Sequence, residues 1–133
     1  MRMSGGIMGF IMTNPNPARN LTGDCVIRAI SIAENKSWDD VFMDLMIRSF
    51  DMKDLPSANE VWSAHLRDLG YKRHIVPDTC PDCYTVEDFT NDHPDGEYIL
   101  ATGSHIVAVK HGNFYDTWNS SGEPIIFYFE KGR

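Results

Sequence analysis

The chain has 133 residues, of which 42% are hydrophobic and 23% charged. This length suits one domain with a sizeable core, and the composition excludes disorder, a collagen-like repeat and a disulfide-rich scaffold. The 19 acidic residues outnumber the 12 basic ones, which gives a formal net charge of -7 without any Lys/Arg-rich run. We therefore expect no nucleic-acid partner, because phosphate binding needs clustered positive charge.

The cysteine content and the lengths of the apolar segments indicate the cell compartment of the protein. Cys25, Cys80 and Cys83 are too few for a secreted disulfide framework, so we expect a cytoplasmic protein. No apolar stretch reaches the roughly 18 residues that span a bilayer, so no membrane partner is expected. Residues 1–13 contain three glycines and are expected to form a weakly structured leader, and residues 14–133 a single domain.

Helical spacing of apolar residues predicts three helices in the first half of the domain. The first covers residues 25–35 and takes its cap from residues 22–24. The second begins after Ser37, which caps it, and the third covers residues 57–69.

From Tyr71 the apolar period shortens to that of β-strands. One short helix is predicted over residues 86–91, before the last strands begin. Strands are predicted over residues 71–76, 98–101, 105–110, 114–118 and 125–129. Helices followed by closely spaced strands predict an α+β fold, in which N-terminal helices pack on a C-terminal antiparallel β-sheet.

Cys25 is a candidate nucleophile. A thiol reacts as the thiolate, and the free N–H groups in the first turn of a helix stabilise negative charge. Cys25 is predicted at that position, where its own N–H can point toward an oxyanion formed beside it. The alternative interpretation is a small buried apolar residue, which is common for unpaired cysteine.

His105 is the candidate base. It opens the apolar run of residues 106–109, where packing gives no reason for an imidazole. The other histidines lie on a helix, in a basic cluster, before a proline or in a turn, and surface roles explain them. A hydrogen-bonded histidine at the end of a sheet is the alternative interpretation for His105.

The hairpin that follows decides which residue can orient His105. A three-residue loop over residues 111–113 places Asn119 opposite His105. A two-residue loop shifts the register by one and brings Asp116 to the His105 side instead. The sequence leaves both registers open.

These residues together resemble the papain-like cysteine peptidase superfamily. The matching features are Gly23-Asp24-Cys25 at a helix start, His105 at the start of a hydrophobic strand, and Asn119-Ser120 after the next strand. The order Cys, His, Asn is also that of the superfamily. Small papain-like proteins of bacteria and their phages are similar from about residue 14 to residue 129, with an Asp-Cys-Val-x-Arg-Ala-Ile helix start and a Tyr-Asp-Thr-Trp strand.

The resemblance implies a papain-like fold and a Cys-His-Asn triad. In this triad Cys25 is the nucleophile, His105 the base and Asn119, in preference to Asp116, the orienting residue. Asn20 is the nearest amide that could complete an oxyanion hole, one position away from that of the superfamily's glutamine. The implied activity is a thiol hydrolase that forms an acyl-enzyme on a peptide, isopeptide or side-chain amide, with no cofactor and no metal. The net charge of -7 disfavours acidic substrates.

A different class of function and a different kind of site remain to be weighed. The alternative function is a phage or bacterial interaction protein that uses a papain-like scaffold without catalysis. Cys80-Pro81-Asp82-Cys83 has the spacing of half a zinc site, but the sequence has no second cysteine pair to complete it. Two surface thiols on a loop, able to form a reversible disulfide, are the expected state of this segment.

Overall fold

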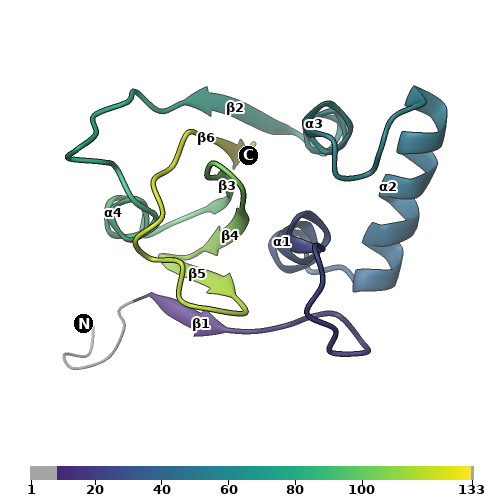
Figure 1. Cartoon of the computed structure of the whole chain (residues 1–133), viewed down its shortest axis with the longest axis horizontal. Helices are drawn as coiled ribbons and strands as arrows, with labels where there is room; N and C mark the ends of the chain where they lie inside the picture. Colours follow the sequence, from purple (N-terminus) through teal and green to yellow (C-terminus); the bar gives the residue numbers. More distant parts are fainter. Residues whose placement is uncertain (1–8, 133) are drawn as a thin grey trace.

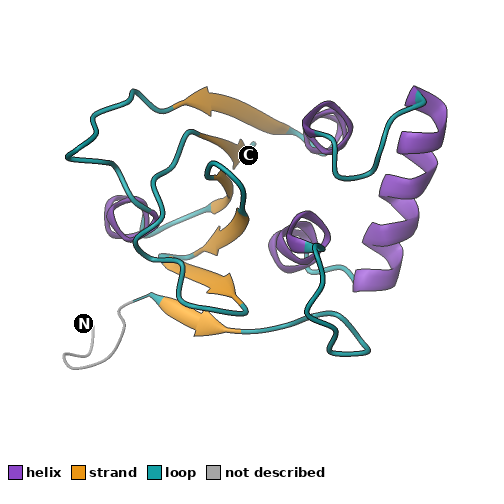
Figure 2. Cartoon of the chain, in the orientation of Figure 1, coloured by secondary structure: helices purple, strands orange, loops and turns teal. Residues whose placement is uncertain are grey.

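The computed structural model describes residues 9–132, in which four helices and six strands form an α+β fold (Figures 1 and 2). The helices are α1 (Cys25–Glu34), α2 (Trp38–Met52), α3 (Asn59–Asp68) and α4 (Val86–Asp92). The strands are β1 (Phe10–Met12), β2 (Tyr71–Ile75), β3 (Glu97–Ala101), β4 (Ile106–Lys110), β5 (Asn113–Asp116) and β6 (Phe127–Lys131). None of the helices in this part of the chain has the length and apolar character needed to cross a bilayer.

Local sequence signals account for several of these helix starts. The Ser37 hydroxyl accepts a hydrogen bond from the Asp40 N–H at 3.1 Å, as expected of the cap of α2. Thr85 and Asp88 form a reciprocal capping box at the start of α4. The predicted helix over residues 57–69 is shorter than expected, because Ser57 precedes the cap position and α3 begins two residues later.

The sheet is mixed rather than antiparallel throughout. Its strand order is β1-β5-β4-β3-β6-β2, and β1 pairs in parallel with β5. The expectation of a weakly structured leader over residues 1–13 is therefore wrong for Phe10–Met12, while residues 1–8 lie outside the described part. Phe10 explains the pairing, because its ring stacks on Phe114 with the centroids 5.2 Å apart.

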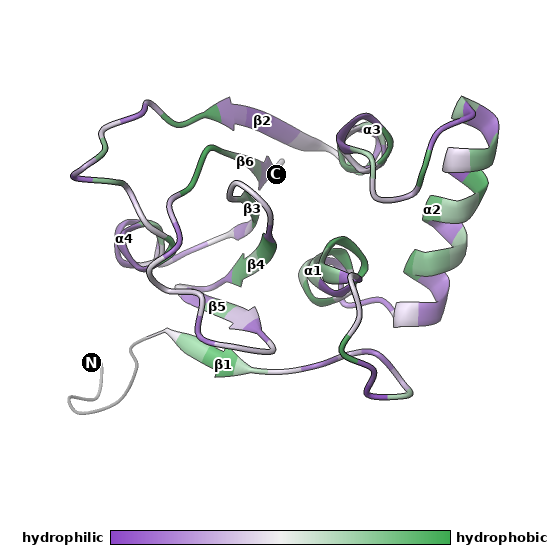
Figure 3. Cartoon of the chain, in the orientation of Figure 1, coloured by the Kyte–Doolittle hydropathy of each residue, from purple (hydrophilic) through white to green (hydrophobic). Residues whose placement is uncertain are grey.

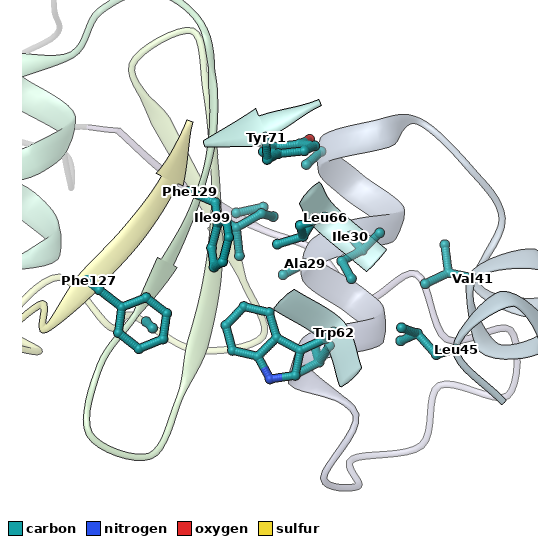
Figure 4. Close-up of a cluster of buried hydrophobic side chains, with 14 residues drawn as sticks. Ala29, Ile30, Val41, Leu45, Trp62, Leu66, Tyr71, Ile99, Phe127 and Phe129 are labelled. Carbon is teal, nitrogen blue, oxygen red and sulfur yellow. The ribbon is translucent and has the colours of Figure 1, made fainter. Parts of the chain in front are cut away.

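Helices cover both faces of the sheet, and each face has its own core. On one face, α1 and α3 pack on Ile99 and Phe129, and α2 forms an outer layer (Figures 1 and 4). On the other face, Phe89 of α4 packs against Leu100 and Val107. Successive residues of β3 therefore enter opposite cores, which explains why the strand is buried from Tyr98 to Ala101, and the hydropathy of the sheet is shown in Figure 3.

The β4–β5 hairpin has a two-residue loop. Lys110 pairs with Asn113, and His111 and Gly112 between them have φ angles of 52° and 79°. Positive φ at both positions is the geometry of the tight turn whose twist matches that of the flanking strands. This loop sets the register that determines which residues of β5 reach the candidate site.

Candidate active site

Cys25 is the first residue of α1, as the sequence predicts. Its side chain is partly buried and is hydrogen bonded to the side chain of His105. The cap of α1 falls within residues 22–24 as expected, at Asp24. The Asp24 side chain, however, makes no capping hydrogen bond. Its carboxylate instead accepts hydrogen bonds from Arg28 and Trp38 at 2.9 Å each, so it does not cover the first-turn N–H groups of α1.

The contact between Cys25 and His105 shifts both groups toward their charged forms. Burial raises the pKa of the Cys25 thiol, but hydrogen bonds with His105 and the Ile106 backbone, together with the His105 charge, bring it below its ordinary value. Burial lowers the pKa of His105, but hydrogen bonds to Asp116 and Cys25 outweigh this and raise it to about 9. The contact therefore shifts Cys25 toward the thiolate and His105 toward the imidazolium.

A tight turn holds His105 at the entrance of β4. The carbonyl of His105 accepts hydrogen bonds from the Thr102 N–H at 2.9 Å and from the Thr102 hydroxyl at 3.2 Å. Trp118 lies over the imidazole with the ring centroids 5.1 Å apart and is itself 44% exposed. The histidine is thus fixed from its backbone and partly screened from solvent.

Asp116, and not Asn119, contacts the imidazole. The Nε2 of His105 lies 2.6 Å from Oδ2 of Asp116, whose side chain is almost fully buried. The expectation for Asn119 is wrong: its side chain is exposed and accepts a hydrogen bond from the Ser121 N–H at 3.1 Å. The reason is the two-residue loop, because a change of one residue in loop length reverses which side chains of β5 reach the histidine.

Several donors hold the Asp116 carboxylate in place. Ser120 donates to Oδ2 at 2.7 Å, and the Thr117 N–H donates to Oδ1 at 2.8 Å. Burial raises the pKa of Asp116, but the hydrogen bonds from His105 and Ser120, with the His105 charge, keep it below its usual range. Asp116 is therefore a buried anion that stabilises the protonated imidazole.

Arg28 joins this carboxylate to the residue before the nucleophile. Its Nε donates to Asp24 at 2.9 Å and one terminal nitrogen donates to Asp116 at 3.3 Å, while the residue as a whole is 8% exposed. A buried guanidinium between two carboxylates neutralises part of their charge and ties α1 to β5. The sequence analysis did not assign Arg28 a role, although its spacing of four from Asp24 on a helix is a signal for such a pair.

Asn20 does not take the expected place beside the nucleophile. Its side chain is exposed, and it is absent from the described residues that line the two cavities at Cys25. The loop before α1 instead brings Leu21, Thr22 and Gly23 to one of these cavities. The oxyanion role of Asn20 is therefore wrong in this structure, because the loop turns its side chain into solvent.

Two cavities flank the Cys25–His105 pair and share both residues. One has a volume of about 240 Å³ and extends over Trp62 and Phe127. The other has a volume of about 310 Å³ and extends toward Trp118. Cys25 and His105 therefore border space on two sides.

Cys80 and Cys83 form a disulfide with each other. They lie on the loop between β2 and α4, and neither lines the cavities beside Cys25. Both sulfur atoms are therefore used in the bond, and Cys25 is the free thiol of the described chain.

Comparison with known protein families, with curated proteins and with solved structures finds no match for this chain.

Proposed function

We propose that this chain is a papain-like thiol hydrolase that acts on a peptide, isopeptide or side-chain amide. The observation that carries the proposal is the hydrogen-bonded series Cys25, His105 and Asp116, which joins a helix start to two neighbouring strands. The arrangement resembles the papain-like one, with a carboxylate in place of the orienting asparagine. A nucleophile, a base and an orienting group in contact are the parts that covalent catalysis needs.

The proposed mechanism follows from the proton positions. The Cys25 thiolate attacks the carbonyl carbon of the substrate while His105 carries the proton. As the tetrahedral intermediate collapses, His105 gives this proton to the leaving amine and a thioester remains on Cys25. Water then attacks the thioester, with its proton going to His105, and the carboxylic acid and the free thiolate are released. Asp116 holds the imidazole orientation in both halves of the reaction.

The first turn of α1 supplies donors for the oxyanion. The N–H groups at the start of a helix have no partner within the helix, and the Asp24 carboxylate is engaged with Arg28 and Trp38 instead of capping them. The N–H of Cys25 is the nearest of these to a carbonyl attacked by its own sulfur. Preorganised N–H donors of this kind stabilise developing negative charge.

Competitive alkylation of the reduced protein tests the proposal. Cys80 and Cys83 are first reduced so that all three thiols compete for a limiting amount of iodoacetamide at neutral pH. Cys25 is expected to react about tenfold faster than the other two, because only its thiolate has an imidazolium partner. Peptide mass spectrometry measures the three rates.

Two histidine variants complete this experiment. His105→Ala is expected to remove the preference for Cys25, whereas His111→Asn, at an exposed turn where asparagine can keep the positive φ, is expected to retain it. Equal rates at the three cysteines of the unaltered protein contradict the nucleophile assignment. Selective labelling without turnover of any peptide or amide substrate in a library indicates the non-catalytic scaffold instead.

A further inference from the structure

We infer that the substrate segment bound beside Cys25 carries an acidic side chain, which Arg67 and Arg73 bind. This inference rests on the proposed function and adds the chemical class of the substrate. The net charge of -7 predicts the opposite preference for the whole surface. The charges that line the groove favour an acidic side chain, and these charges are closer to a bound substrate than those of the rest of the surface.

The cavity at the thiol continues toward the two arginines. The 240 Å³ cavity that contains Cys25 and His105 also includes Asn59 and Phe127. A neighbouring cavity of about 310 Å³ includes the same Asn59 and Phe127. The two cavities are neighbours with Asn59 and Phe127 as common walls, and together they are called the groove between α3 and the β6 end of the sheet.

The floor and the far end of this groove differ in chemistry. Near the thiol the floor is aromatic, with Trp62 stacked on Phe127 at a centroid distance of 6.0 Å (Figure 4). At the far end Arg67 of α3 and Arg73 of β2 line the second cavity. The groove thus offers apolar contact first and positive charge farther out.

The two guanidinium groups are available to a ligand. Within residues 9–132 neither has a carboxylate at salt-bridge distance, although Glu60 lines the same cavity. Arg73 lies over the Phe127 ring at 4.4 Å, which fixes its guanidinium at the groove wall. With two positive groups and one carboxylate, the far end has a net positive charge and fits an acidic side chain.

Helix geometry gives the distance along α3 from Asn59, which both cavities share, to Arg67. Arg67 lies eight positions after Asn59 on α3, which corresponds to about 12 Å along the helix axis. An extended peptide covers about 3.3 Å per residue, so this distance corresponds to roughly four residues. Because Asn59 is a wall common to both cavities, the acidic residue is expected about four or more positions from the bond that Cys25 attacks.

Two sets of peptide electrophiles test the inference. Alanine-based peptides with a C-terminal vinyl sulfone extend on the acyl side of Cys25, and those with an N-terminal chloroacetyl group extend on the leaving-group side. Each set carries Glu, or Gln as the matched neutral residue, at each position in turn. We expect Glu to react about fivefold faster than Gln at one or two positions of one set, since exposed ion pairs are individually weak. The preference is expected to disappear at about 1 M salt.

Variants assign this preference to the arginines. In the double variant Arg67→Gln and Arg73→Gln the Glu-to-Gln ratio is expected to fall to about one, whereas Lys72→Gln, on the adjacent position of β2, is expected to keep it. Each rate is divided by the iodoacetamide rate of Cys25 in the same variant, so a change in folding or thiol reactivity cancels. A ratio of about one at every position of both sets overturns the inference while selective iodoacetamide labelling leaves the proposed function intact. Absence of selective Cys25 labelling in the unaltered protein overturns both the inference and the proposed function.

Discussion

Arginine has two different roles along the connected cavities at Cys25. Arg28 is 8% exposed and donates to Asp24 and Asp116, so its charge is neutralised within the fold. Arg67 and Arg73 are exposed at the other end, and no carboxylate of residues 9–132 lies within salt-bridge distance of them. Burying an unpaired arginine costs much desolvation free energy, so a buried arginine is paired within the protein, whereas an exposed one can pair with a ligand.

The difference also separates stability from recognition. Removing Arg28 leaves buried Asp24 without a cation and Asp116 with His105 alone, so the fold itself is affected. Removing Arg67 leaves only solvated groups, and removing Arg73 loses its contact with the Phe127 ring, so a much smaller effect on the fold is expected. Three measurements sharpen this comparison, in order of decreasing effect.

The largest effect is expected for the Arg28→Met variant, as a decrease in the free energy of unfolding. Breaking a buried ion pair from one side costs about 3–5 kcal/mol, and here one cation serves both Asp24 and Asp116. Urea unfolding measures the free energy of unfolding. Arg67→Gln is the matched control and is expected to change it by less than about 0.5 kcal/mol. A loss below about 1 kcal/mol for Arg28→Met would mean that the network does not support the fold.

Asp116→Asn is expected to slow the iodoacetamide labelling of Cys25 by about tenfold. The neutral amide no longer stabilises the imidazolium, so less of the thiolate is present at neutral pH. Asn119→Ala is the control and is expected to change the rate by less than about twofold, because its side chain is exposed and does not touch His105. A larger effect at residue 119 than at residue 116 contradicts the observed register.

The pH dependence gives the smallest effect. Between about pH 7 and pH 8 the labelling rate of Cys25 is expected to rise less steeply than that of reduced Cys83, because the contact with His105 lowers the pKa of Cys25. Reduced Cys83 is labelled in the same samples and is the comparison thiol. Turnover is expected to fall above about pH 9, where His105 loses the proton that the leaving group needs. In the His105→Ala variant Cys25 is expected to follow the Cys83 profile.

The sequence predicted the local elements well. Helix spacing gave the bounds of α1 within a residue, the Ser37 cap gave the start of α2, and the strand pattern gave β2 and β3 within a residue. These elements are determined by nearby residues, so a single sequence is sufficient to find them. Phe10–Met12 was missed because its pairing with β5 joins segments about a hundred residues apart, and three residues alone carry no strand pattern.

The two halves of the site differ in the same way. Cys25 was predictable from its position at a helix start, and His105 from its misfit with an apolar strand. The third residue was not, because Asn119 and Asp116 differ by a register that one loop residue decides. The resemblance favoured Asn119. In the structure the two-residue loop, with positive φ at His111 and Gly112, gives the register in which Asp116 contacts His105.

What the sequence by itself determined is the four helices, the strands after residue 70 and the choice of Cys25 and His105 as candidate site residues, because periodicity, caps and residue chemistry are local properties. Only the tertiary structure decided that Asp116 holds the imidazole and that Arg28 joins it to Asp24. It also placed Arg67 and Arg73 at the end of the groove that begins at Cys25. These contacts join helix, strand and loop across long sequence separations, and their partners are set by strand register and by the packing of α1 and α3 on the sheet.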